Sequence, residues 1–587
     1  MLQIIFGCLV ELDLLPLVQP PGKLNDLWKF NVLTWEWTWM SGSDKVNQSG
    51  AYNVFTDSYP GARSGHSSTQ TNGENFWLFG GIGLDINENN GLLSDLWQFD
   101  GLNWKWVKGG NVIDKAGIYG NLGQASSSNM PGSRWHGILE AIDNQTLILF
   151  GGYGHDKNGS QGRLNDLWIF NIVSENWTWI DGEQVINQPG IYKDFGNSSP
   201  DTKPGSRQDL MSWVDQNTKG LWMFGGFGYD ANGNLGRLND LFYWNNGNWA
   251  WMKGDMEINS YGIYGSLGIP SSSNTPGARN GGTTWIDSNG DLWLFGGRGY
   301  DDANYGYLND LWKYDVAQNK WVWMSGSNHA NQPGTYYGAP ITLVPGCREN
   351  AEGWIDSNGD LYLFGGYGYD DSQDPWERLN DLWKYDVSSG IWTFLKGSNT
   401  SDQPGDYGII NTPNTSNVPG ATKEAGGWID DYDNLYLFGG SGRDDANNLG
   451  DLNSLWKYGI PSLEINITTL LEGPYDTNEM MNTSLDLSTQ LTHPYGSKHS
   501  GNETVSSNFF GNHPEIVDWI VVELRTGTAA NTKISSRAAF LKNDGSIVDI
   551  DGYSAVSFNG ISSGNYYVVV YHRNHLPIMS ANPILVN

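Results

Sequence analysis

Five arginines and five aspartates recur in this chain at matched positions, and their types suit buried ion pairs. The pairs are Arg63 with Asp95, Arg134 with Asp166, Arg207 with Asp240, Arg279 with Asp310 and Arg348 with Asp381. In the last copy both positions change together, to Thr422 and Ser454. A joint change is expected of direct partners, because an unpaired buried charge costs several kcal/mol.

The sequence therefore predicts five ion pairs, each within one repeat, bidentate and within about 4 Å. The competing arrangement joins each arginine to the aspartate of the preceding repeat, as in Arg63 with Asp26.

Acidic loops follow a glycine pair in the repeats and could ligate calcium, which accepts six to eight oxygen ligands. The candidate ligands are Asp230, Asp301 and Asp370. The bidentate glutamate that ends an EF-hand loop is missing, and Asp, Asn and Gly are also common in exposed turns. Structural turns are therefore favoured over a metal site.

Tyrosines recur in two sets of connections and could contact a protein or glycan ligand. The candidates are Tyr153, Tyr229, Tyr300, Tyr367 and Tyr369 in one set and Tyr192, Tyr264 and Tyr336 in the other. The alternative is that these regular Gly-x-Tyr motifs brace long loops. Binding and bracing are both consistent with the pattern.

All these residues belong to a unit of about 70 residues that occurs seven times. The phrase Leu-Asn-Asp-Leu-Trp begins at Leu24 and returns, with small changes, at residues 92, 164, 238, 308, 379 and 452. Pro-Gly-x-Arg, a run ending in Phe-Gly-Gly, this phrase and Trp-x-Trp follow one another in order. Each predicts a strand, because short aromatic runs bounded by glycine are typical of buried strands. Such self-similarity is the mark of a repeat array.

Four strands, a glycine pair and an aromatic outer strand resemble the kelch repeat, whose blades close radially into a β-propeller. The resemblance covers about residues 1–458 and implies an all-β, kelch-type β-propeller, with seven blades favoured and six possible. The first repeat lacks its first strand and the last lacks its fourth, and the opening residues suggest truncation at the N-terminus. A kelch unit has about 50 residues, and the surplus here lies between the fourth strand and the next repeat.

Topology predicts where the long connections gather. In an up-and-down blade the second-to-third and fourth-to-first connections emerge on one face. Both kinds are long here, so this face, with its tyrosines, is the expected binding face. Most tryptophans occupy repeat positions instead and are expected to pack between blades.

A second domain is expected over residues 459–587. Its alternating strands have no internal repeat and indicate a β-sandwich. The pattern resembles C-terminal modules of bacterial surface proteins.

Galactose oxidase carries a copper radical site on a kelch propeller, which by resemblance needs two histidines and a tyrosine cross-linked to cysteine. The propeller has only His66, His136, His155 and His329, and Cys8 and Cys347 occupy positions expected in the repeat core. No Ser-His-Asp order or paired-carboxylate motif stands apart from the repeats. No catalytic residue, metal or cofactor is therefore assigned.

The acidic composition of the chain limits the classes of partner that it could bind. The net charge of −31 argues against nucleic acid and anionic membranes, because both require concentrated Lys or Arg. No stretch of 18 apolar residues exists that could span a membrane, and the N-terminus is a poor signal peptide. The favoured function is a non-enzymatic extracellular or surface-associated protein that binds protein or glycan. A copper-radical oxidase or other propeller enzyme and an intracellular kelch adaptor are the alternatives.

Overall fold

The computed structural model describes residues 3–6, 22–31, 36–53, 58–71, 75–372, 375–430, 433–459, 462–470, 480–483, 485–496, 499, 503–506, 509–559, 561 and 564–586. Cys8 lies outside the described residues. Contacts divide the chain into two compact units: Met1–Trp428 with Tyr436–Trp456, and Ile429–Leu435 with Lys457–Asn587.

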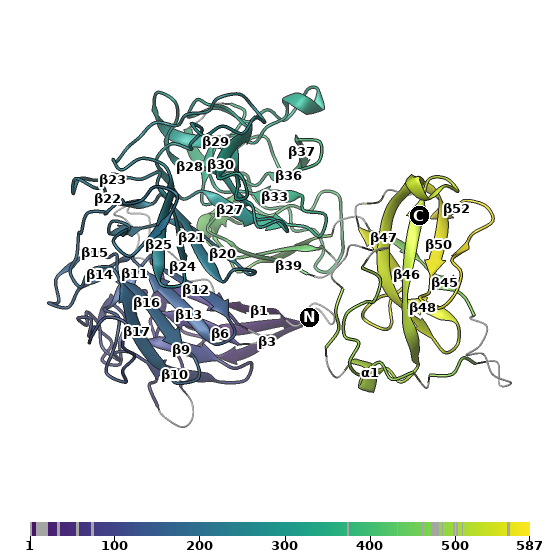
Figure 1. Ribbon diagram of the computed structural model, residues 1–587, viewed down its shortest axis with the longest axis horizontal. Helices are drawn as coiled ribbons and strands as arrows, with labels where there is room; N and C mark the ends of the chain where they lie inside the picture. Colours follow the sequence, from purple (N-terminus) through teal and green to yellow (C-terminus); the bar gives the residue numbers. More distant parts are fainter. Residues whose placement is uncertain are drawn as a thin grey trace. The chain divides into compact units, whose positions relative to one another are not determined.

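The first unit consists of antiparallel sheets whose strand order follows the chain (Figure 1). Among the described residues, the larger sheets are β1–β2–β3 (Gln3–Phe6, Leu27–Asn31, Glu36–Ser41), β5–β6–β9–β10 (Ser67–Gln70, Phe76–Phe79, Leu96–Phe99, Trp104–Lys108), β12–β13–β16–β17 (Ile138–Asp143, Thr146–Phe150, Leu167–Asn171, Asn176–Asp181), β20–β21–β24–β25 (Met211–Asp215, Gly220–Phe224, Leu241–Asn245, Asn248–Lys253), β27–β28–β29–β30 (Thr283–Ile286, Leu292–Tyr300, Tyr305–Asp315, Lys320–Ser325), β32–β33–β36–β37 (Glu352–Ile355, Leu361–Phe364, Leu382–Asp386, Ile391–Lys396) and β39–β40–β43 (Gly426–Ile429, Leu435–Phe438, Leu455–Tyr458).

Successive sheets pack radially through their inner strands. The strands β5, β12, β20, β27 and β32 lie side by side in this order. At four junctions, the phenylalanine of the Phe-Gly-Gly run meets the first outer tryptophan of the next sheet. The ring-centroid distances are 5.8 Å for Phe79–Trp177, 5.4 Å for Phe150–Trp249, 5.5 Å for Phe224–Trp321 and 5.5 Å for Phe295–Trp392.

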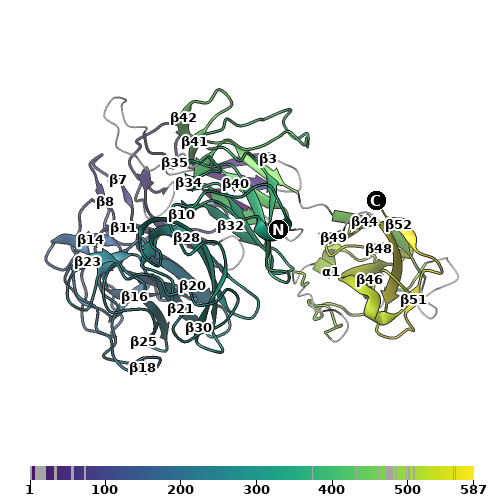
Figure 2. The same ribbon diagram turned by 90° about the horizontal axis from the view of Figure 1, so that it is seen from above.

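The same contact joins the last sheet to the first. Phe438 of β40 lies 5.3 Å from Trp37 of β3, and Tyr436 lies 6.4 Å from Phe30 of β2. This junction, here called the seam, repeats the contacts found at the other junctions. The arrangement is a β-propeller-like fold (Figure 2).

A smaller sheet accompanies most of the larger ones, and the sequence did not predict it. These sheets are β4–β7–β8 (Arg63–Ser64, Ile82–Leu84, Asn90–Leu92), β11–β14–β15 (Arg134–Trp135, Tyr153–His155, Gln161–Arg163), β19–β22–β23 (Arg207–Gln208, Phe227–Tyr229, Leu235–Arg237), β31–β34–β35 (Arg348–Glu349, Tyr367–Tyr369, Pro375–Arg378) and β38–β41–β42 (Thr422–Lys423, Ser441–Arg443, Leu449–Asp451). In the fifth repeat β26 (Arg279–Asn280) pairs with the far end of β28, so the large and small sheets are continuous.

Two expectations are corrected by these small sheets. Pro-Gly-x-Arg does not begin the inner blade strand but enters the small sheet, and the second-to-third connection is a hairpin rather than an open loop. The glycine pair turns the chain from one sheet to the other, with φ of +64° at Gly151 and +93° at Gly152. Close approach excludes a side chain at Gly154, where a Cβ would lie 2.1 Å from Ser133 O.

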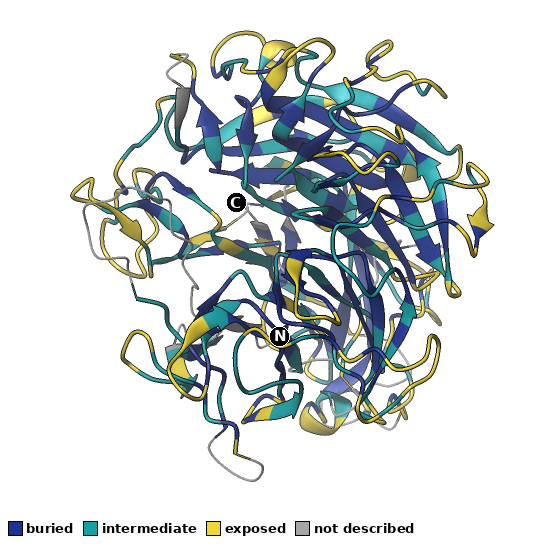
Figure 3. Cartoon of the chain, turned by 90° about the vertical axis from the view of Figure 1, so that its left-hand side faces the viewer, coloured by how far each residue is buried: buried dark blue, intermediate teal, exposed yellow. Residues whose placement is uncertain are grey.

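The surplus length of each repeat covers the outer edge of the next sheet. In the loop after β17, β18 (Ser198–Ser199) pairs with β25, and Ser126 and Ser271 form bridges to Trp177 and Trp321 in the neighbouring repeats. The one short 3₁₀ helix of this unit in the described residues, η1 (Pro340–Thr342), lies in a loop of this kind. Covered edges are protected from pairing with other chains. Strands are mostly buried and the turns and loops exposed (Figure 3).

The second unit is also built from strands. The pair β44–β49 (Ser462–Ile465, Val556–Asn559) stands beside the sheet β45–β48–β47–β46–β50–β51 (Ile467–Thr468, Ser546–Val548, Lys533–Lys542, Ile516–Arg525, Gly564–Tyr571, Ile578–Met579), with β52 (Ile584–Val586) paired to β50. Short helical turns are α1 (Phe509–Asn512) and η2 (Ala530–Thr532).

Both faces of β46 in this unit are buried. Leu463 and Phe558 of the β44–β49 pair share one core with Ile520, and Trp519 packs in a second core on the other face. Residues 463–468 therefore pair within this unit, and do not supply an outer strand to the last propeller sheet.

Candidate binding face and central cavity

The structure joins each of the five expected arginine–aspartate pairs within its own repeat. Arg134 Nη1 and Nη2 each lie 2.7 Å from an Asp166 carboxylate oxygen, and both side chains are at most 1% exposed. The other pairs have the same bidentate geometry, at 2.5 to 2.7 Å: Arg63–Asp95, Arg207–Asp240, Arg279–Asp310 and Arg348–Asp381. Arg134 also donates to the carbonyls of Gly132 and Gly151. Each arginine thus connects its small sheet to its large one.

Three of the tyrosines expected to bind ligand brace these pairs instead. The hydroxyls of Tyr192, Tyr264 and Tyr336 donate to the buried aspartates at 2.6 to 2.8 Å. Trp312 Nε1 donates to the same Asp310 oxygen as Tyr264. Burial and the Asp310 charge raise the pKa of Tyr264 well above its usual value. A carboxylate removed from water needs these donors, so bracing is the role of this tyrosine set.

The acidic loops are closed by their own aspartates. Asp230 Oδ1 accepts from the backbone N–H groups of Asn232 and Asn234, and Asp370 accepts from Ser372 and Ser401. Asp301 accepts from the N–H of Ala330 at 2.6 Å and lies beside Asp302 and His329. All three carboxylates are buried and engaged by loop donors. These contacts are those of structural turns.

The other tyrosine set lies in the small sheets, where arginines stack on aromatic rings of the same repeat or of the next one. Each guanidinium lies over an aromatic ring, within cation–π distance. The distances to the centroid are 4.5 Å for Arg163 over Phe227, 4.8 Å for Arg237 over Tyr305, 5.4 Å for Arg298 over Tyr307 and 5.9 Å for Arg378 over Tyr367.

Tyr153, Tyr229, Tyr300 and Tyr367 remain partly exposed in these sheets, and Tyr300 packs against Tyr261 and Tyr305. Tyr369 is different, because it is buried against Tyr307 and is 8% exposed. Tyr369 therefore packs in its small sheet against Tyr307.

A cavity of about 660 Å³ lies among the inner strands and small-sheet residues. Its lining is mostly charged and polar, with Leu210 and Met211 as apolar members, and its polar side chains include His136, Asp209, Arg237, Arg298, Asn350 and Glu424. Because the Pro-Gly-x-Arg strands and the second-to-third hairpins supply this lining, the cavity belongs to the face on which the long connections were expected. The sequence did not single it out.

One position of the repeat forms a rim at this cavity, two residues after the arginine of the motif or, in the last repeat, after Thr422. The rim residues are Gly65, His136, Asp209, Gly281, Asn350 and Glu424, and all but Gly65 line the cavity. All have positive φ, between +51° and +68°. Backbone bonds link neighbours around the rim: His136 N–H donates to Gly65 O at 3.1 Å, and Asn350 N–H to Gly281 O at 2.9 Å.

Four rim positions carry side chains in a backbone region that favours glycine. Such residues cost free energy, and they cluster at functional sites. His136 Nδ1 contacts the Asp209 carboxylate, and Asn350 Nδ2 donates to Glu424 Oε1 at 2.8 Å. The signal available from sequence was that this position varies among Gly, His, Asp, Asn and Glu inside an otherwise constant motif.

Partly buried glutamates lie on the inner strands. Burial raises the pKa of Glu140 to about 7, although a hydrogen bond from Ser212 lowers it. Burial likewise raises the pKa of Glu352 to about 8. Glu140 lines the cavity, which therefore holds a carboxyl group that can accept or donate a proton near neutral pH.

Two of the histidines considered for copper contact aspartates, and Cys347 contacts a backbone amide. His136 pairs with Asp209 and His329 lies by Asp302, while Cys347 Sγ accepts from the Gln332 N–H. Among the described residues, the groups of three side chains close enough to share an ion are Asp301 with Asp302 and His329, and His493 with His499 and Glu503. No described helix is long and apolar enough to cross a membrane.

Comparison with known proteins gives two findings. Residues 357–398, which run from the first-to-second turn of the sixth repeat to its outer strand, match the kelch motif. A stretch of 133 residues is 29% identical to the dynein alpha chain of the flagellar outer arm from Chlamydomonas reinhardtii, covering 22% of this chain and 2% of that protein. The chain thus spans a small part of that relative. The kelch motif and the many small sheets together support a kelch-type β-propeller.

Proposed function

We propose that this chain is a non-enzymatic binding protein whose propeller holds a polar segment of a partner protein at the rim of the central cavity. The observation that carries the proposal is the rim, where side chains occupy strained backbone positions around a polar cavity. A rim built for stability alone would use glycine, as Gly65 and Gly281 do.

A polypeptide fits this cavity better than a glycan. Sugar recognition commonly relies on stacking against an aromatic ring, and among the described residues the only ring in the cavity lining is the imidazole of His136. Charged and amide groups of both signs suit the backbone and polar side chains of a peptide. Tyr300 and its neighbours add an aromatic patch on the small sheets for the rest of the partner.

The proposal extends to the architecture. The seam supports a ring of seven blades, because the Phe438–Trp37 contact joins the last sheet to the first in the way that phenylalanine and tryptophan join sheets at four other junctions. The C-terminal unit would act as a β-sandwich spacer or attachment module. An extracellular or surface location is proposed with it.

The alternative is that the protein is an adaptor inside the cell. The similarity to a dynein chain of the flagellar outer arm favours this intracellular location. Imaging of the tagged chain in its source cells separates the two. Signal inside the cell would reject the extracellular proposal, while leaving the binding face to its own test.

Rim side chains can be removed without straining the backbone, because glycine prefers these φ angles. Peptides that bind the wild-type protein are first selected from a displayed random library. We expect the triple variant His136→Gly, Asp209→Gly and Asn350→Gly to keep the thermal midpoint of the wild type and to bind these peptides no longer. Glu175→Gly and Lys219→Gly are the matched control, since both have positive φ but lie in third-to-fourth and first-to-second turns.

Three outcomes would contradict the proposal. Peptides could bind both proteins equally, the selection could enrich none while a glycan array gives a strong signal, or the purified protein could contain copper and turn over as an oxidase.

A further inference from the structure

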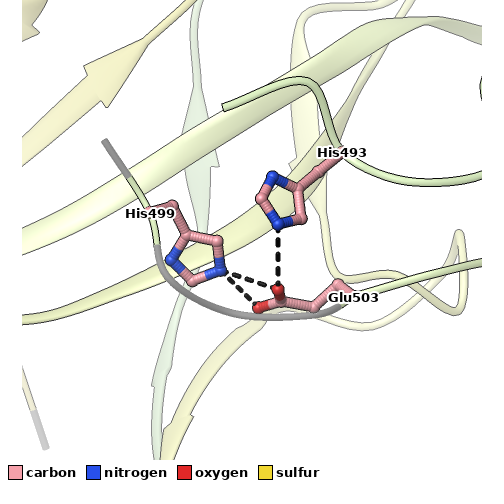
Figure 4. A group of neighbouring side chains, drawn as sticks. All are labelled: His493, His499 and Glu503. Atoms are coloured by element: carbon pink, nitrogen blue, oxygen red, sulfur yellow. Dashed lines mark hydrogen bonds and ion pairs between the residues drawn. The ribbon is translucent and has the colours of Figure 1, made fainter. Parts of the chain in front are cut away.

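Three side chains that could hold a metal converge in one loop of the C-terminal unit, outside the propeller (Figure 4). His499 Nε2 lies 2.7 and 2.8 Å from the two oxygens of Glu503, and His493 Nε2 lies 3.8 Å from Glu503 Oε2. All three side chains are nearly buried, with exposed fractions of 4%, 5% and 11%. The loop supplies them at the spacing His-x5-His-x3-Glu.

The sheet behind the loop fixes this arrangement. Ser536 Oγ of β47 lies 3.0 Å from His499 Nδ1, and the Ala538 N–H donates to Glu503 Oε1 at 3.4 Å. On the other side of the loop, the Tyr495 hydroxyl donates to Trp519 O at 2.7 Å. A hydroxyl at the far nitrogen of a histidine is a common way to orient a metal ligand.

Charge at the site suits a cation. The carboxylate of Glu503 lies between the two imidazoles and supplies the negative charge. The nearby Arg537 is occupied by Asp549, at 2.8 Å. Two imidazoles and one carboxylate are a donor set for zinc, whereas calcium and magnesium prefer oxygen ligands.

Distances also fit a tetrahedral ion. Bonds of about 2.0 to 2.2 Å place ligand atoms roughly 3.4 Å apart. The observed separations of 2.7 Å and 3.8 Å lie on either side of this value, so small side-chain shifts suffice. We propose that His493, His499 and Glu503 form a zinc-binding site that fastens the loop to the sheet, with one position left for water.

One contact sets the strength of binding. His493 Nδ1 accepts a hydrogen bond from the Tyr495 N–H at 3.2 Å. Coordination through Nε2 puts the ring proton of a neutral imidazole on Nδ1, so this contact must open when the metal binds. Its loss makes the site weaker than one whose second nitrogen already donates.

The test uses the full-length chain after removal of metal with a chelator. Zinc is titrated in competition with a chromophoric chelator, and cobalt(II) is added separately because its absorption spectrum reports tetrahedral coordination. We expect one zinc per chain, a higher unfolding temperature of the C-terminal unit with zinc, and a tetrahedral cobalt spectrum. His499→Gln and Glu503→Gln should each weaken zinc binding by at least about 100-fold, since loss of an outer contact alone costs 10- to 100-fold.

Controls separate binding from folding. His513→Gln removes another buried histidine beside a carboxylate, Glu515 at 3.3 Å, and should leave zinc binding unchanged. Ser536→Ala keeps all three ligands and should weaken zinc binding about tenfold. Absence of stoichiometric zinc binding by the wild-type chain, or equal binding by His499→Gln and His513→Gln, would overturn the proposal.

Discussion

At the scale of single residues, the buried carboxylate of Asp310 holds its repeat together through three kinds of donor. Asp310 accepts from Arg279, Tyr264 and Trp312, and Arg279 in turn donates to the carbonyls of Gly277 and Gly296. One ion pair thus connects the Pro-Gly-x-Arg segment, the Phe-Gly-Gly turn and the strand of Asp310 to the loop that carries Tyr264. Removing one of the two charges should therefore weaken the contacts of all four segments.

We predict that Asp310→Asn lowers the free energy of unfolding by about 3 kcal/mol, because it leaves Arg279 buried and unpaired. Tyr264→Phe should cost only about 1 kcal/mol, since the pair itself remains. Urea unfolding followed by tryptophan fluorescence measures both.

The last repeat provides the matched control. It replaces the pair with Thr422 and Ser454, and Trp456 Nε1 donates to Ser454 Oγ at 3.0 Å. Arg279→Thr with Asp310→Ser should therefore be less harmful than Asp310→Asn alone. Equal losses in the two variants would show that the unpaired charge is not what destabilises the fold.

Glu140 gives the fold a pH dependence of known sign. Its pKa is raised from 4.5 to about 7, so the folded state favours the protonated form. Its contribution is fully present below about pH 4.5 and is lost as the pH rises to 7, by an amount of order 1–3 kcal/mol.

We predict that Glu140→Gln flattens the fall in stability between pH 5 and pH 7, measured by urea unfolding at several pH values. The exposed Glu257 supplies a control, because Glu257→Gln should leave the profile unchanged. A wild-type stability that rises across this range would contradict the assignment.

At the scale of elements, the sequence predicts the strands and contacts that recur from repeat to repeat, and it does not predict those that lack a repeated pattern. The large-sheet strands and the arginine–aspartate pairs followed from repeated residue types. The small sheets did not, because Arg134–Trp135 and Tyr153–His155 are too short for any periodicity to appear. Loop tyrosines such as Tyr264 were ambiguous for another reason, since burial of a hydroxyl depends on a partner 46 residues away.

The candidate site was missed for a related reason. Sequence points to recurring residues, and the rim is the position where the repeats differ. Its importance comes from backbone angles and from the meeting of five repeats at one cavity. Neither is visible in a single copy of the repeat.

At the scale of the whole molecule, the C-terminal unit has cores of its own. We predict that residues 462–587 expressed alone will fold, giving a strand-rich circular dichroism spectrum and a cooperative thermal transition. The propeller fragment 1–459 serves as the comparison. A C-terminal fragment that is unfolded in native buffer would show that the two units depend on each other.

The seam differs from the other propeller junctions in one respect: the rings it joins, Trp37 and Phe438, stand about 400 residues apart in the chain. Its closure therefore carries the largest loop-closure entropy of any junction. We expect the seam to form after the other propeller junctions during synthesis and to open before them on unfolding. The lifetime of the folded ring is then set at this one place, and Phe438→Ala should speed unfolding far more than it slows folding.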